Sequence, residues 1–236
     1  MSLIKFIYKV IFIYNFIMHN TVKNLIYIED EIKSKANDPN KDKLTKIIAV
    51  SKTFSIDKIL PLVDHGHIDY GENKVQEAID KWTETKSKNI KIKLHLIGKL
   101  QTNKVKFALK IFDYIHSLDS EKLANKISVE QLKQGKKPKI FIQVNIGNED
   151  QKSGIDKKKL VDFFNFCKNL SLDIIGTMCI PPNNVNTENY FSEMNKINQE
   201  LNFKELSMGM SGDYLNAVKN DATYVRIGSK IFGSRN

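Results

Sequence analysis

The sequence has few cysteines, glycines and prolines. Its two cysteines, Cys167 and Cys179, lie in apolar surroundings, and neither has a partner at the spacing of a CxxC motif or a zinc site. A disulfide framework and a metal site are therefore not indicated, and we expect a reducing, cytoplasmic compartment. With 11 glycines and 5 prolines among 236 residues, the chain lacks the composition of long linkers, so we expect one large core.

Arginine is also scarce. Only Arg226 and Arg235 occur, so the formal net charge of +10 comes almost entirely from lysine, which is abundant along the whole chain. The lysine runs at 136–137 and 157–159 lack the interleaved aromatic residues or arginines that favour nucleic-acid binding. We interpret the basic charge as a composition bias on a solvated surface and expect no nucleic-acid partner.

A long uninterrupted hydrophobic run is absent. Residues 3–17 begin like a signal peptide, but Lys9 and Asn15 interrupt them and no small-residue cleavage site follows. We interpret 1–17 as an apolar extension from a misassigned start, with initiation at Met18 and one domain over 18–236. No membrane partner is expected, and a helix on a membrane surface is the alternative.

Apolar, β-branched segments alternate with amphipathic segments along the rest of the chain. We predict strands at 46–52, 67–71, 94–98, 113–118, 139–146, 173–180, 205–210 and 223–228. We predict helices at 56–64, 73–86, 103–110, 120–134, 156–169, 187–201 and 212–219. This alternation is typical of a parallel sheet covered by helices, and eight strands favour an α/β fold: a single (β/α)8 TIM-type barrel, with an extra helix over about 20–36. An open doubly wound sheet is the alternative, but no GxGxxG motif follows the first strand.

Ligand chemistry in such a barrel gathers at the carboxyl ends of the strands. Lys52 follows the buried run 47–51, where desolvation favours a neutral amine that can condense with an aldehyde. The segments 207–211 and 226–229 lie at the ends of strands seven and eight and combine serine, glycine and arginine, the parts of a phosphate site. Together they predict a Schiff base with a phosphorylated aldehyde. The alternatives are a surface lysine, a glycine that eases packing, and an arginine paired with a core carboxylate.

Six motifs, in order from about residue 46 to the C-terminus, resemble those of the YggS/PROSC family of pyridoxal phosphate homeostasis proteins. They are Ala49-Val50-Ser51-Lys52, Tyr70-Gly71-Glu72-Asn73-Lys74-Val75-Gln76-Glu77, His95-Leu96-Ile97-Gly98-Lys99-Leu100-Gln101-Thr102-Asn103-Lys104, Lys152-Ser153-Gly154-Ile155, Leu206-Ser207-Met208-Gly209-Met210-Ser211 and Val225-Arg226-Ile227-Gly228-Ser229-Lys230-Ile231-Phe232-Gly233. The chain has Ser229 where the family often has threonine, which keeps the hydroxyl, and Lys99 and Tyr70 where many relatives have proline and phenylalanine.

The resemblance implies a fold type III barrel like the N-terminal domain of alanine racemase, with pyridoxal 5′-phosphate as the cofactor. It implies that Lys52 forms the Schiff base with the cofactor. The other implied contacts are Ser207, Gly228 and Ser229 at the phosphate with the backbone of Met208, Arg226 at the pyridine nitrogen, and Asn73 near the ring.

The implied role is to buffer and deliver pyridoxal phosphate within vitamin B6 and amino-acid homeostasis, with pyridoxal-phosphate-dependent apo-enzymes as recipients and no catalytic residue. Arginine at the pyridine nitrogen makes the ring a weaker electron sink. The chain ends at Asn236, before any β-domain of the racemase kind, so we expect a monomer without the racemase tyrosine. One alternative is a small racemase with Tyr214 or His95 as second proton donor, and another is a sugar-phosphate enzyme with Lys52 as Schiff-base lysine.

Overall fold

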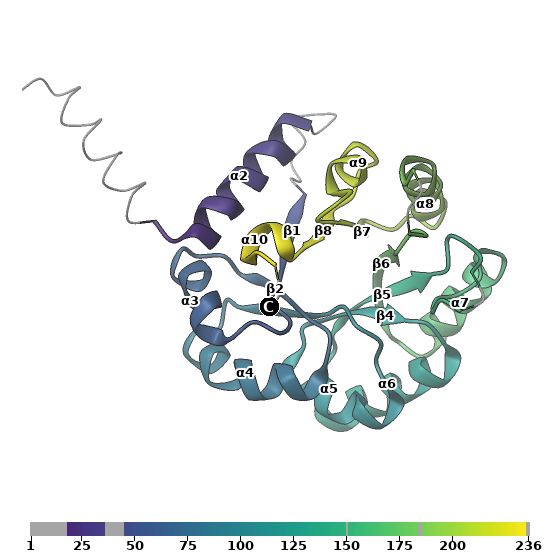
Figure 1. Ribbon diagram of the computed structural model, residues 1–236. Coiled ribbons are helices and arrows are strands. Elements are labelled where there is room, and N and C mark those ends of the chain that lie inside the picture. The colour runs from purple at the N-terminus through teal and green to yellow at the C-terminus, as the bar shows by residue number, and fades with distance from the viewer. Residues whose placement is uncertain (1–17, 36–44, 150, 184–185, 235–236) are drawn as a thin grey trace, which may run out of the picture.

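Eight parallel strands close into a barrel in the computed structural model, which describes residues 18–35, 45–149, 151–183 and 186–234 (Figure 1). Each strand pairs with the next along the chain, and the eighth pairs with the first. The strands are β1 (Lys46–Val50), β2 (Asp69–Glu72), β3 (Lys93–Leu96), β4 (Tyr114–Leu118), β5 (Lys139–Val144), β6 (Asp173–Cys179), β7 (Glu205–Met210) and β8 (Tyr224–Ile227). The predicted (β/α)8 barrel is therefore confirmed.

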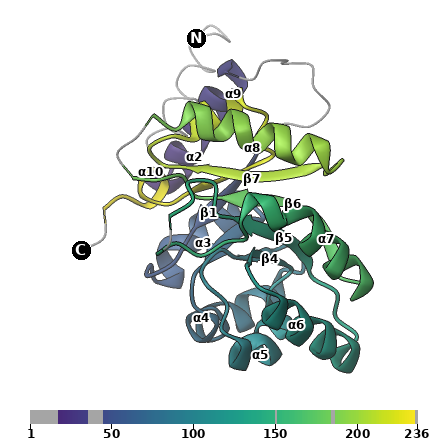
Figure 2. The ribbon, with the colours of Figure 1, turned by 90° about the vertical axis from the view of Figure 1, so that its right-hand side faces the viewer.

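Helices cover the outside of the barrel, as Figures 1 and 2 show from two directions. Those between or after the strands are α3 (Ile56–Asp64), α4 (Val75–Lys88), η1 (Thr102–Lys104), α5 (Val105–Ile111), α6 (Glu121–Gln134), η2 (Lys157–Lys159), α7 (Leu160–Asn169), α8 (Glu188–Glu200), α9 (Tyr214–Lys219) and α10 (Ser229–Phe232). Their apolar faces and the outward strand residues form the large core, in which Trp82 and Phe191 are completely buried. A second core fills the barrel itself and consists of Ile48, Tyr114, Phe141, Met178 and Tyr224.

The predicted extra helix is present as α2 (Asn20–Lys35). Val22, Leu25, Ile28 and Ile32 recur at helical spacing and are all buried, and α2 packs against α3, α9 and α10 (Figure 1). Asn24 ties it to the last helix, because its Nδ2 donates to the Ile231 carbonyl at 2.9 Å. The helix therefore covers the seam at which β8 meets β1.

The observed strands and helices differ from the predicted ones mainly in where they begin and end. The strand predicted to reach Lys52 ends at Val50, and the helix predicted from 156 begins with the separate 3-10 turn η2. Asp156 caps that turn, since its carboxylate accepts the Lys158 N–H at 2.8 Å. The expectations for 1–17 lie outside the described residues. No helix in the described segments combines the length and apolar character needed to cross a membrane.

Candidate functional site

Lys52 lies in the turn that follows β1, at the carboxyl end of the barrel. Ser51, which precedes it, is completely buried, and its backbone N–H donates to the Gly71 carbonyl at 3.0 Å. Thr53, which follows it, has a φ of 69°, in the left-handed region. The lysine is partly exposed between these two residues. The backbone that carries Lys52 is thus anchored to β2 on one side and turns sharply on the other.

Glu72, at the end of β2, holds this turn from beneath. Its carboxylate is completely buried, and Oε1 accepts hydrogen bonds from the Ser51 hydroxyl at 2.8 Å and from Lys81 Nζ at 3.0 Å. The indole N–H of Trp82 donates to the same oxygen at 2.9 Å. A buried carboxylate with three donors is fixed in place, because moving it would leave several polar groups unpaired.

Lys81 and Glu77, both on α4, complete the anchoring on either side of Lys52. Lys81 Nζ also donates to the Ser51 carbonyl at 2.9 Å and bonds Glu77 Oε1 at 3.0 Å. Glu77 Oε1 accepts the Thr53 N–H at 2.6 Å. Partial burial raises the pKa of Glu77, but the Thr53 N–H and Lys81 outweigh it and the pKa is lowered. Helix α4 therefore fixes the backbone immediately before and after Lys52.

Arg226 points into the barrel from β8 and is only 4% exposed. Its Nη1 donates to the Ser207 hydroxyl at 2.8 Å and its Nη2 to the Cys179 carbonyl at 2.9 Å. Burial lowers its pKa from the usual value. No described carboxylate forms an ion pair with it, which removes the alternative of a core salt bridge within the described chain. A buried cation with neutral partners is suited to an electron-rich ligand acceptor.

A chain of hydrogen bonds leads from Arg226 through the barrel interior to β2. Ser207 Oγ lies 3.0 Å from His116 Nδ1, His116 Nε2 lies 2.9 Å from His95 Nδ1, and His95 Nε2 lies 2.9 Å from Asp69 Oδ1. Both histidines and Ser207 are completely buried. We call this chain the interior relay.

The direction of each bond in the interior relay follows from its two ends. Asp69 can only accept, so His95 donates from Nε2, and Arg226 can only donate, so Ser207 accepts from it. Burial lowers the pKa of His95 and lowers that of His116 well below the usual value, so both rings are neutral. Each neutral ring donates once and accepts once, and the Ser207 hydroxyl therefore donates to His116.

Gly228 lies where β8 passes the end of β1. A side chain there would place its first carbon 3.3 Å from the Val50 carbonyl oxygen, so the two strand ends are in close contact. The Gly228 N–H donates to the Ser211 hydroxyl at 3.3 Å, which joins the loops after β7 and β8. Ser229 is exposed and opens α10. Closure of the barrel thus brings the predicted phosphate segments next to the strand that leads to Lys52.

The remaining predicted residues lie around the same end. Asn73 follows β2, and its backbone packs against Gly98, where an added side-chain carbon would come within 2.4 Å of the Asn73 carbonyl oxygen. Met208 is completely buried in the outer core, which leaves only its backbone for a ligand. Ser207 lies within β7 rather than at its end and contacts Arg226 directly.

Sequence reasoning missed the roles of Glu72, Lys81 and His116. A signal existed for the histidines, because His95 and His116 occur in strands that are otherwise largely apolar. A buried histidine in such a strand needs a polar partner. We call the hydrogen bonds of Glu72, Lys81 and Glu77 to the residues on either side of Lys52 the clamp. The sequence had no comparable signal for it, since Lys81 is one of many lysines on helical surfaces.

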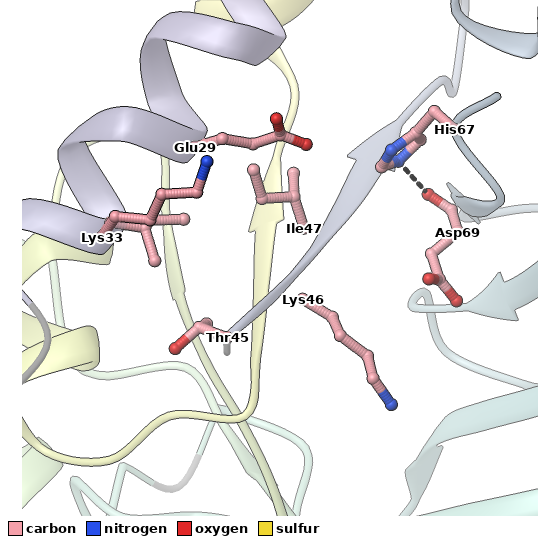
Figure 3. A pocket seen from close by; sticks show the side chains of 8 residues that line it. Glu29, Lys33, Thr45, Lys46, Ile47, His67 and Asp69 are labelled. Atoms are coloured by element: carbon pink, nitrogen blue, oxygen red, sulfur yellow. Dashed lines mark hydrogen bonds between the residues drawn. The ribbon is translucent and has the colours of Figure 1, made fainter. Parts of the chain in front are cut away.

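A cavity of about 320 Å³ lies at the opposite end of β1, beneath α2 (Figure 3). Glu29, Lys33, Lys46, His67 and Asp69 are among its lining residues, and His67 Nε2 contacts the Asp69 carbonyl at 2.9 Å. None of the predicted site residues lines it. The interior relay therefore ends at this cavity, and Arg226 lies at the relay's other end.

Comparisons with known proteins agree with the barrel fold. Residues 30–236 match the family described as alanine racemase, N-terminal domain. The pyridoxal phosphate homeostasis protein of Haemophilus influenzae is 36% identical over 230 residues, which cover 92% of this chain and 97% of that protein. The protein of the same name from Aquifex aeolicus is 36% identical over 200 residues, covering 80% and 87%.

Two kinds of solved structure are similar to this one. PipY of Synechococcus elongatus with pyridoxal phosphate bound has a TM-score of 0.80 and 32% identity, covering 90% of this chain and 100% of that one. Alanine racemase of Clostridium difficile has a TM-score of 0.68 and 17% identity, covering 92% of this chain and 57% of that one. The second likeness concerns the fold alone.

We expect the neutral histidines of the interior relay to make stability depend on pH. Their folded-state pKa values lie below the unfolded value of 6.5, so the unfolded chain binds more protons and stability falls as the pH drops below about 6.5. In His116→Leu this fall should be shallower, by up to about 1.4 kcal/mol per pH unit. Urea unfolding at a series of pH values measures it. His65→Leu, which changes an exposed histidine, should keep the wild-type slope, and equal slopes for all three proteins would contradict the assignment.

Proposed function

The chain belongs to the family of pyridoxal phosphate homeostasis proteins, and on this basis we propose that it binds pyridoxal 5′-phosphate through Lys52 and buffers the cofactor for vitamin B6 and amino-acid homeostasis. The observation that carries the proposal is the clamp of α4 and Glu72 on both sides of Lys52. It fixes the backbone of one partly exposed lysine at the ligand-binding end of the barrel. PipY, with 32% identity, was solved with pyridoxal phosphate bound.

The residues around Lys52 fit the chemical groups of the cofactor. Pyridoxal phosphate supplies an aldehyde, which condenses reversibly with a primary amine. In our proposal Lys52 contributes that amine, and Asn73 lies beside the ring. Arg226 would donate to the pyridine nitrogen, because a buried guanidinium with neutral partners accommodates an acceptor that carries no proton.

The phosphate would bind where the loops after β7 and β8 meet. Ser229 would contribute its backbone N–H and hydroxyl beside the end of β1, Met208 its backbone, and Gly228 its N–H, which donates to Ser211 in this structure. We propose that Ser207 acts at the same site, and its bond to Arg226 links it to the ring end as well. Ser211, whose hydroxyl accepts the Gly228 N–H, is an additional residue of this loop.

We further propose that the protein carries the cofactor and has no dedicated amino-acid reaction. Racemisation needs a second acid or base on the far face of the substrate, and Tyr214 and His95 were the candidates. The Tyr214 hydroxyl donates to Glu31 on α2, and His95 is completely buried between Asp69 and His116. Both groups have partners away from the loop of Lys52, which supports the carrier role.

Delivery to pyridoxal-phosphate-dependent apo-enzymes in the cytoplasm, by a monomer, completes the proposal. The exposed large apolar side chains among the described residues come from α2, the segment after α4, the helices α5, α6 and α7, and the end of β7. They are Tyr27, Ile90, Phe107, Val129, Leu132, Val161 and Met210.

We expect Lys52→Ala to abolish covalent binding of pyridoxal phosphate. Wild-type protein incubated with the cofactor should show a visible absorbance band that borohydride removes, with the reduced adduct on Lys52 in peptide mass spectra. Lys74→Ala is the control, because Lys74 is an exposed lysine next to Asn73 in the same region. A band that survives in Lys52→Ala, or an adduct on another lysine, would overturn the assignment.

Ser207→Ala should weaken cofactor binding by about 1 to 3 kcal/mol, because Arg226 and His116 lose their common partner. Equilibrium titration with pyridoxal phosphate measures the change. Ser117→Ala is a matched control, since Ser117 is also buried in a barrel strand and its hydroxyl has no hydrogen-bond partner among the described residues. Equal affinities for Ser207→Ala and wild type would remove Ser207 from the site.

The carrier role predicts no racemisation of alanine by the cofactor-loaded protein above the rate of free pyridoxal phosphate. Chiral chromatography after incubation with L-alanine measures it. Racemisation that is fast in wild type and lost in Lys52→Ala would instead identify a small racemase.

A further inference from the structure

A basic groove lies at the amino ends of β3, β4 and β5, the end of the barrel opposite to Lys52. Its volume is about 510 Å³. Seven of its lining residues are lysines: Lys86, Lys91, Lys93, Lys110, Lys136, Lys137 and Lys139. They come from α4, α5 and the segments that lead into β3 and β5, so the fold gathers charges that are far apart in the sequence. We call this feature the lysine groove.

Among the residues that line the lysine groove, the positive charge is almost uncompensated. Asp113 is the single acidic residue in the lining, and its carboxylate already binds Lys86 and the Leu94 N–H. For the other six lysines the structure records no ion pair within the described chain. Seven lysines against one aspartate give the groove a net charge of +6, compared with +10 for the whole protein. A uniform composition bias would spread this charge more evenly.

Helix ends account for only part of this clustering. Lys86 and Lys110 lie in the last turns of α4 and α5, where a cation offsets the negative end of the helix dipole. Lys136 and Lys137 follow the carboxyl end of α6, and Lys91 follows that of α4, so the same effect reaches them in part. Lys93 and Lys139 begin strands, where no helix dipole requires them. Like charges at this density repel one another, so their convergence around a hollow favours a bound anion.

We propose that the lysine groove binds a small anion that carries several phosphate groups. Lysines contact phosphate as flexible point charges, and several of them match a ligand of high charge density. The aromatic residues of the lining, Phe112 and Tyr114, are buried, and Lys139 lies over the Tyr114 ring at 5.7 Å. The groove therefore offers no exposed aromatic platform or arginine for stacking nucleobases, which argues against a nucleic acid.

Calorimetric titration with inorganic tripolyphosphate tests this proposal. Lys136→Gln/Lys137→Gln/Lys139→Gln should weaken binding about tenfold or more, because three charges at the groove are lost. Lys157→Gln/Lys158→Gln/Lys159→Gln removes the same charge from another lysine run and should bind like wild type. Both variants should keep the borohydride-sensitive band of Lys52, which verifies the fold.

Three results would overturn the proposal. If both triple variants weaken tripolyphosphate binding equally, the anion is attracted by the net charge of the protein and not by the groove. Loss of tripolyphosphate binding in Lys52→Ala would place the anion at the other end of the barrel. The third result is binding of a single-stranded oligonucleotide that the groove variant weakens and the control variant does not, while tripolyphosphate does not bind. It would make the groove a nucleic-acid surface.

Discussion

The site depends on the burial of one guanidinium inside the barrel. Arg226 is 4% exposed, and its described partners are the neutral groups Ser207 and the Cys179 carbonyl. A charge in such a place needs every available hydrogen bond. The interior relay orients one of these hydrogen-bond partners. The neutral histidine rings on β3 and β4 fix the Ser207 hydroxyl, and Asp69 in turn fixes the rings. The guanidinium is not paired directly with Asp69, and in our proposal it donates to an uncharged nitrogen acceptor.

Closure of the barrel gives the site its second constraint. Gly228 passes the end of β1 so closely that a side chain would contact the Val50 carbonyl, and Lys52 follows two residues later. Lys52 and Gly228 therefore lie on neighbouring strand ends although they are 176 positions apart in the chain. Helix α4 then fixes the turn from outside through Lys81 and Glu77. The backbone of Lys52 is thus positioned by the pairing of β1 with its neighbours and by the hydrogen bonds from α4. This explains how a lysine in a loop can have a defined place.

The sequence predicted most elements well because strands such as β1 and β5 are nearly continuous apolar runs and the helices have polar faces. Lys52, Asn73 and Gly228 could be placed at one end of the barrel, here called the mouth, because a parallel barrel puts the carboxyl ends of all its strands on one rim. Ser207 was placed at a strand end, whereas it lies inside β7 and bonds Arg226. The relay and the clamp could not be predicted, because they depend on which inward side chains meet across the barrel and on which of many lysines reaches Glu72.

The two ends of the barrel use positive charge in different ways. At the mouth, Arg226 is desolvated and held by neutral partners, so its interactions are directional and little screened by salt. At the lysine groove most of the charges are exposed and flexible, so their attraction for an anion falls as ionic strength rises. Ile48, Phe141 and Met178 fill the barrel between the ends. Because Arg226 is buried whereas most of the groove lysines are exposed, ionic strength should change the attraction of the groove for an anion while leaving the contacts of Arg226 in place.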